Sequence, residues 1–225
     1  MKNKLLVICI LGVMAIIFIY YGTINNKVRL LSLGDGFASG MTAYNVNGYS
    51  YADYLKDYYK KENNLENYNN IFPEANLTSE QLYNNIKKNI KKSYNSKNIA
   101  IQQAIKEANV IIISVGLDEL SSKSLYNKVT SKDLNNYYSN INNILKIIRK
   151  INNEKVILLG LYQAYNIKEV DKINKNLNKL AISNNCEFLD VSKTIVNEEY
   201  FFNNTSYYLN YKGHKKVNEE LIKLI

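Results

Sequence analysis

The chain has 225 residues, a formal net charge of +9, and 46% hydrophobic residues. This composition excludes an intrinsically disordered protein, and the length is enough for one well-buried domain plus a short appendage. Cys9 and Cys186 lie in separate apolar stretches that would not pair, and the single histidine is too few for a zinc site. We therefore predict no disulfide framework, no metal and no cofactor.

The first predicted element is a membrane segment, because residues 5–21 form an uncharged run of 17 residues. No small-residue cleavage site follows it, which favours an uncleaved anchor over residues 1–22, with a cleaved signal peptide as the alternative. Lys2 and Lys4 favour a cytoplasmic amino terminus, although Lys27 and Arg29 weaken that bias. We expect a single-pass protein of the cell membrane with an extracytoplasmic domain over residues 28–225, joined by a linker at residues 23–27.

Strands and helices alternate through the rest of the chain. Short apolar runs, typical of strands, occupy residues 28–33, 65–72, 110–115, 155–161 and 187–191. Helical spacing or capping residues predict helices over 49–61, 78–92, 99–108, 131–149 and 170–183, and a last helix capped by Asn210. Ser96 and Ser131 are the expected caps of the third and fourth of these helices.

This alternation predicts the α/β class, as a three-layer α/β/α sandwich around a five-stranded parallel sheet of the flavodoxin-like kind. Strand 110–115 is an almost unbroken β-branched run, which is typical of a strand covered on both faces. Ligands of such folds bind beyond the carboxyl ends of the strands. The loops after Leu33 and Val115, and the one before the last helix, are therefore the candidate site.

The densest basic run comprises Lys87, Lys88, Lys91 and Lys92, followed by Lys97. It could contact anionic lipid or a cell-wall polymer, but a solvated helix face is the interpretation we favour. No interleaving of arginine with aromatic residues indicates a nucleic-acid groove, so nucleic acid is not an expected partner.

Five short motifs, three of them in these loops, resemble the SGNH/GDSL hydrolase family. They are LGDGFASG (33–40), GYSYADYL (48–55), NLTSEQL (76–82), VGLDEL (115–120) and YLNYKGH (208–214), in the family's order. The resemblance covers essentially all of residues 28–225. It implies the SGNH-hydrolase fold and, for an intact member, hydrolysis of acyl or carbohydrate esters by a GDSL-like lipase or esterase.

The residues that the family uses for catalysis are replaced. The resemblance places the nucleophile at Gly36, the oxyanion-hole glycine at Asn76 and the oxyanion-hole asparagine at Asp118. It places the catalytic aspartate and histidine at Thr205 and Tyr208.

These replacements argue against acyl transfer. Gly36 has no nucleophilic atom, Tyr208 is a poor base near neutrality, and an ionised Asp118 would repel an oxyanion. Ser39 and His214 could form a substitute pair, but a small loop residue and a structural histidine are the interpretations that we favour.

The altered site could instead bind a ligand. We expect Asp35, Asp118, Glu119, Tyr207 and Tyr208 to gather at one rim, where Tyr44 or Tyr49 could join them. Carboxylates and aromatic rings suit sugar hydroxyls, amino groups or a cation. The alternative is a vestigial cleft in which Asp35 only holds its loop by accepting hydrogen bonds from backbone amides.

The leading hypothesis is a catalytically inactive binding or scaffold protein at the cell surface. Its partners would be the membrane, through residues 5–21, and cell-wall glycan or a membrane protein. The alternatives are an active esterase with a rearranged site, and a subunit of a membrane complex whose role lies in the membrane segment.

Overall fold

The computed structural model describes residues 12–14, 27–126, 128–163, 169–203 and 206–225. Most of the predicted membrane segment, residues 5–21, lies outside these ranges, and residues 12–14 are helical. Within the described ranges, no helix is both long and apolar enough to cross a bilayer. The membrane anchor therefore stays a prediction.

Five parallel strands form the central sheet, as the alternating sequence pattern predicts. They are β1 (Val28–Gly34), β2 (Leu65–Asn69), β5 (Val110–Ser114), β6 (Lys155–Leu159) and β7 (Glu187–Leu189). Their spatial order is β2-β1-β5-β6-β7, and each neighbouring pair is parallel. The predicted α/β sandwich is thus confirmed.

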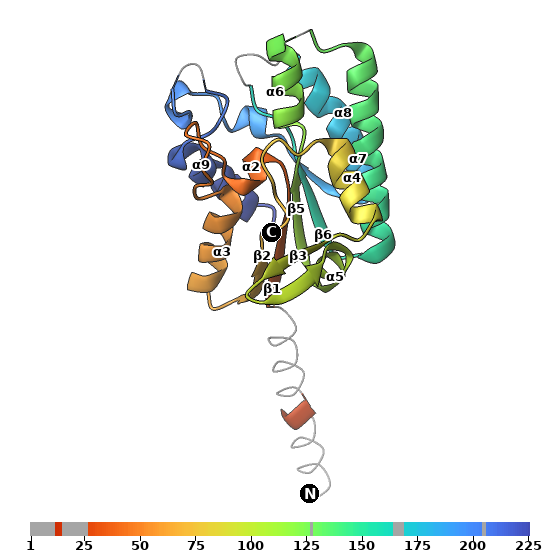
Figure 1. The fold of residues 1–225 in the computed structure, drawn as a ribbon. Coiled ribbons are helices and arrows are strands. Elements are labelled where there is room, and N and C mark those ends of the chain that lie inside the picture. The colour runs from red at the N-terminus through yellow and green to blue at the C-terminus, as the bar shows by residue number, and fades with distance from the viewer. Residues whose placement is uncertain (1–11, 15–26, 127, 164–168, 204–205) are drawn as a thin grey trace, which may run out of the picture.

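Helices cover both faces of the sheet (Figure 1). On one face α3 (Tyr51–Lys61) packs against α9 (Tyr211–Ile222). The other face carries α4 (Ser79–Lys87), α5 (Ile101–Glu107), α7 (Ser131–Ile151) and α8 (Val170–Ser183). Two shorter helices, α2 (Gly36–Ser39) and α6 (Leu117–Tyr126), directly follow strands β1 and β5.

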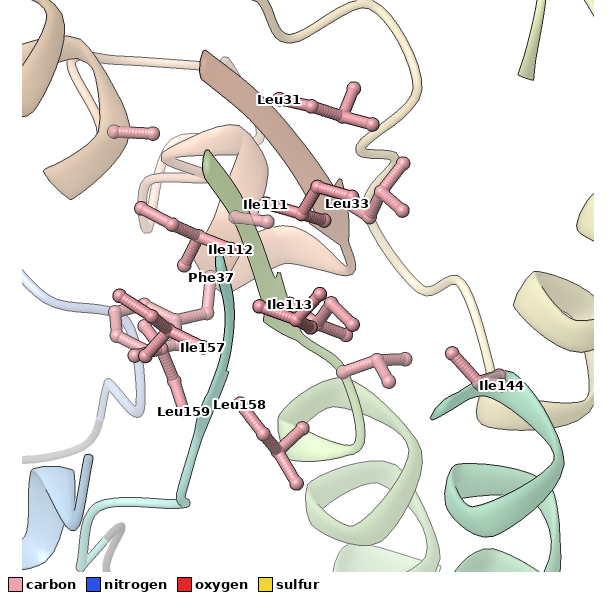
Figure 2. Packing of buried hydrophobic residues seen from close by; sticks show 14 of the residues in the cluster. Leu31, Leu33, Phe37, Ile111, Ile112, Ile113, Ile144, Ile157, Leu158 and Leu159 are labelled. Carbon is pink, nitrogen blue, oxygen red and sulfur yellow. The ribbon is translucent and has the colours of Figure 1, made fainter. Parts of the chain in front are cut away.

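The core lies between these layers and is built by alternation along the strands. All five residues of β5 are buried, in keeping with a strand covered on both faces. Figure 2 shows Ile112 and Ile157 on the side of the sheet where Phe37 lies, and Ile113 on the side of Ile144 in α7. Phe37 lies in α2, which directly follows β1, so the same packing that stabilises the sheet also fixes the candidate site.

One region differs from the sequence prediction. The predicted helix over 78–92 ends at Lys87, where Asn89 adopts a φ of 51°. The chain then forms an antiparallel hairpin of β3 (Lys91–Tyr94) and β4 (Lys97–Ala100), which turns through Asn95 and Ser96, both with positive φ. Two successive residues with positive φ are the geometry of a two-residue hairpin turn. Ser96 is therefore a turn residue, and α5 begins at Ile101 without a side-chain cap.

Smaller differences concern the ends of elements. The cap of α7 is Thr130, not Ser131, because the Thr130 hydroxyl accepts a hydrogen bond from the Asp133 N–H in a reciprocal capping box. The sequence analysis did not predict α6, which begins within the candidate site itself. Asn210 caps α9 as predicted, accepting hydrogen bonds from the N–H groups of Lys212 and Gly213.

Candidate functional site

The candidate site lies where β1 and β5 end side by side. Gly34 ends β1 with a φ of 145°, and a Cβ atom on it would lie 1.7 Å from the Ser114 carbonyl oxygen. Only glycine permits this approach of the two strands. The two loops that follow are therefore held in contact, and their carboxylates, Asp35 and Asp118, meet there.

Asp35 is fully buried and holds both loops together. Its Oδ1 accepts a hydrogen bond from the Phe37 N–H at 3.1 Å, which caps the short helix α2. Its Oδ2 accepts from the N–H groups of Gly116 at 2.9 Å and Asp118 at 3.2 Å. This is the loop-holding arrangement that the sequence analysis weighed for Asp35, and it commits both carboxylate oxygens to the backbone.

Asp118 places a carboxylate oxygen between two backbone donors. Its Oδ2 accepts from the Gly36 N–H at 2.8 Å and from the Asn76 N–H at 2.7 Å. These donors belong to two positions that the family resemblance assigns to the nucleophile and to the oxyanion-hole glycine. Asn76 has a φ of 62°, a left-handed conformation that asparagine tolerates where a glycine would be usual.

The absence of a side chain at position 36 is a geometric requirement of this arrangement. A Cβ atom on Gly36 would lie 2.6 Å from Asp118 Oδ2 and 3.1 Å from Oδ1. The carboxylate thus occupies the space into which a serine at this position would project. Gly36 and Asp118 are mutually dependent: the first makes room for the second.

The two carboxyl groups share a water-poor environment that disfavours their ionised forms. Burial and the nearby charge of Asp118 raise the pKa of Asp35 well above its ordinary value, against the opposing hydrogen bonds from backbone amides. Burial likewise raises the pKa of Asp118, although the Asn76 and Gly36 amides oppose it. Asp118 Oδ1 is buried and has no hydrogen-bond partner among the described residues, which adds to this penalty.

Glu119 forms a hydrogen bond to the start of a helix. Its Oε2 accepts a hydrogen bond from the Ser79 N–H at 2.9 Å, at the first turn of α4. A carboxylate at a helix amino terminus is favourably placed against the helix dipole. The structure therefore gives Glu119 a structural partner outside the carboxylate pair.

Three tyrosines lie near the carboxylates. The Tyr207 hydroxyl donates to the Tyr208 hydroxyl at 3.0 Å, and the Tyr162 hydroxyl donates to the Tyr207 carbonyl at 2.6 Å. Burial raises the pKa of Tyr208, and the contact with Tyr207 and the negative charges of Asp118 and Asp35 raise it further. Tyr208 stays a neutral phenol and offers no base at the position that the resemblance assigns to the catalytic histidine.

Ser39 and His214 each have other contacts. The Ser39 hydroxyl contacts the Gly36 carbonyl at 3.2 Å and Asn47 Oδ1 at 3.3 Å. His214 is 3% exposed and stacks on Phe37, with ring centroids 5.7 Å apart. Its Nδ1 has no hydrogen-bond partner in the described part of the chain, and burial lowers its pKa to about 3. A histidine in this state is a neutral core side chain.

The remaining expected rim residues are placed elsewhere. Tyr44 is 78% exposed and packs edge-on against Phe202. Tyr49 contacts α3, where its hydroxyl donates to Asp57 and Lys56 lies over its ring. Thr205 lies outside the described residues.

The sequence analysis missed two groups that belong to the hydrogen-bond network of the site. One is Tyr162, which is fully buried and follows the carboxyl end of β6, at the same sheet edge as the carboxylates. Its position directly after a predicted strand could have identified it as a residue of the site. The other is the Asn76 backbone N–H, which side-chain patterns cannot reveal.

Comparison with known proteins supports the fold. No family model matches the sequence, and no curated protein matches it. Among solved structures, a lipase/acylhydrolase from Enterococcus faecalis is similar with a TM-score of 0.63 and 16% identity, covering 88% of this chain and 95% of that one. A lipolytic G-D-S-L family protein from Veillonella parvula has a TM-score of 0.61 and 13% identity, with coverage of 88% and 97%.

A carbohydrate acetylesterase family member from Sinorhizobium meliloti is equally similar in fold, with a TM-score of 0.61 at 9% identity and coverage of 88% and 97%. These likenesses span nearly the whole of each solved chain. The protein therefore has the SGNH-hydrolase fold that the five sequence motifs predicted.

Proposed function

We propose that this SGNH-hydrolase-fold protein is catalytically inactive and acts as a binding or scaffold module at the cell surface. Residues 5–21 would hold it in the membrane, with the domain on the extracytoplasmic side. Cell-wall glycan is a candidate ligand, because Tyr207 and Tyr208 are partly exposed and aromatic residues suit sugar binding. On this account the protein keeps the fold of the hydrolases but does not catalyse ester hydrolysis.

One observation carries the proposal: the Asp118 carboxylate accepts the hydrogen bonds of the Gly36 and Asn76 N–H groups. In an acyl-transfer enzyme, such donors must be free to stabilise a developing oxyanion. Here an oxygen of the Asp118 carboxyl group already accepts from both of them. Loss of a single such donor typically costs ~10²–10³ in rate, and the position of the nucleophile is also empty of any side chain.

The test is an esterase assay of the full-length chain in detergent with p-nitrophenyl acetate. We expect hydrolysis at the background rate of the ester, with no change in the Ser39→Ala and His214→Ala variants. These two variants remove the hydroxyl and the imidazole that a rearranged site would use, so they test that alternative directly. Saturable turnover that either substitution abolished would overturn the proposal and establish an active esterase.

A further inference from the structure

The amino ends of the parallel strands form a basic surface at the end of the domain opposite the candidate site. Lys27, Lys56 and Lys60, together with Asn63 and Leu65, line one open cleft of about 540 Å³ there. Lys27 directly precedes β1, and Lys60 lies in the last turn of α3. The cleft thus combines three lysine side chains with one apolar side chain, that of Leu65.

Two of these ammonium groups form no close ion pair within the described part of the chain. Arg29 is paired with Glu66 at 3.1 Å, and Lys56 is paired with Asp57 at 3.2 Å. Lys27 and Lys60 are exposed, and neither forms an ion pair with any described residue. The Asp57 carboxylate also interacts electrostatically with Lys60, so the cleft has three lysines to one carboxylate. It therefore carries a net positive charge that a phosphate group would neutralise.

The β3–β4 hairpin extends this surface. Its Tyr94 and Ile99 line a neighbouring cleft together with Lys56 of α3, and Figure 1 draws the hairpin in the lower part of the domain. Lys91 and Lys97 are exposed on it, and Tyr94 between them is 53% exposed. Lysines with an exposed tyrosine match the composition of a membrane–water interface. The basic run noted in the sequence is divided between the end of α4, which holds Lys87 and its C-cap Lys88, and the hairpin, which holds Lys91, Lys92 and Lys97.

The length of the preceding chain restricts where this surface can lie. Lys27 is fixed to the domain, because its carbonyl accepts a hydrogen bond from Asn109 Nδ2 at 2.8 Å. Only residues 22–26 separate it from the uncharged run that ends at Tyr21. Six extended residue steps span at most about 20 Å. An anchored chain would therefore keep this end of the domain close to the lipid headgroups.

We propose that the strand-amino-end surface, comprising Lys27, Lys56, Lys60 and the β3–β4 hairpin, docks on anionic lipid headgroups of the membrane, with a lipid phosphate in the cleft between Lys27 and Lys60. This docking rests on the proposed anchor. It would fix the orientation of the domain on the membrane, with the candidate site directed away from the bilayer. The chemistry involved is the attraction of basic side chains to an anionic surface, which falls off within a Debye length.

The test places the full-length chain in nanodiscs of phosphatidylcholine alone or of phosphatidylcholine mixed equally with phosphatidylglycerol. A short pulse of acetic anhydride followed by mass spectrometry then gives the acetylation rate of each lysine. We expect Lys27, Lys60 and Lys97 to react several-fold more slowly in the anionic discs. Protection should vanish at ~1 M NaCl, where the Debye length is ~3 Å. Lys193, with an 81% exposed side chain beyond the carboxyl end of β7, should react equally in both.

Variants with the same net charge distinguish an effect of this surface from an effect of the overall charge of the protein. In Lys27→Gln/Lys60→Gln the protection of Lys97 should be lost, whereas Lys172→Gln/Lys193→Gln should retain it. Equal reactivity of Lys27 and Lys60 in both kinds of disc, from a chain that co-purifies with the discs, would overturn the docking and leave the anchor standing. Failure to co-purify with either disc would overturn the anchor, and the docking with it.

Discussion

Gly36, Asn76 and Asp118 form a local unit in which each residue explains the other two. Gly36 leaves room for the carboxylate, Asn76 supplies a left-handed backbone whose N–H faces it, and Asp118 joins them. A hydrolase needs the same two N–H groups unoccupied. The three residues therefore form a closed polar centre in which both N–H groups are already hydrogen-bonded, as the proposed loss of hydrolysis requires.

A first prediction follows for Gly36→Ala. The new methyl group would displace the Asp118 carboxylate from its two backbone donors, so we expect a loss of about 2–4 kcal/mol in the free energy of unfolding. Urea denaturation measures it. Gly48→Ala is the matched control, because a Cβ there meets only the Thr42 methyl at 3.1 Å and the Gly40 carbonyl at 3.4 Å, and its cost should stay below about 1 kcal/mol.

The same substitution in an Asp118→Ala background tests the coupling. With the carboxylate removed, Gly36→Ala has nothing to displace, and the double variant should be more stable than additivity predicts by at least about 1 kcal/mol. Strict additivity would show that the two positions are energetically independent and would contradict the arrangement described.

His214 gives a second prediction, concerning pH. Burial lowers its pKa from 6.5 to about 3, so between these values the unfolded chain binds a proton that the folded chain does not. Stability should therefore fall as the pH drops through that window, by up to ~1.4 kcal/mol per pH unit. The raised carboxyl pKa values of Asp35 and Asp118 act in the opposite direction, since they favour the folded state on the acid side.

The His214→Phe variant isolates the histidine contribution, because this is the only histidine in the chain. Denaturation curves of both proteins between pH 4 and 7, a range set by the ordinary histidine pKa, should diverge as the pH falls, with the variant losing less stability. Parallel curves would mean that His214 is solvated or paired in the folded protein.

At the scale of elements, capping residues decide where helices begin. Thr130 and Asp133 form a reciprocal box at the start of α7, although Ser131 was the cap expected from sequence. We predict that Thr130→Ala lowers the free energy of unfolding by about 1 kcal/mol, whereas Ser131→Ala changes it by less than about 0.5 kcal/mol. Thermal denaturation of the two variants distinguishes them, and the reverse order would place the cap at Ser131.

Residues with a left-handed backbone conformation explain why the β3–β4 hairpin was not predicted. Among the described residues, six of the eight non-glycine residues with positive φ are asparagines, including Asn89 and Asn95. In this asparagine-rich chain with 9 glycines, asparagine takes turn positions where glycine is the usual signal. The lysine-rich stretch between them offers no alternation of apolar residues, so its helical continuation was the natural but wrong extrapolation.

At the scale of the whole molecule, hydrophobic pattern and motif order were sufficient to predict the fold. The β-branched run of β5 and the apolar run of β1 made the sheet predictable, because strands buried on both faces tolerate few other compositions. The sequence also identified the positions at which the family's catalytic residues are replaced. It could not predict how these positions interact, because the Asp118 carboxylate accepts hydrogen bonds from backbone N–H groups, which sequence motifs do not encode.

The most direct measurement of the central claim is intact-mass analysis after incubation with a fluorophosphonate, alongside an active serine esterase as the positive control. Such reagents modify a hydroxyl only where a base activates it and an anion site receives the phosphoryl oxygen. With the Gly36 and Asn76 donors occupied by Asp118, we predict an unchanged mass for the full-length chain while the esterase is labelled. A single stoichiometric adduct, mapped to Ser39 or any other hydroxyl of the site, would contradict the account.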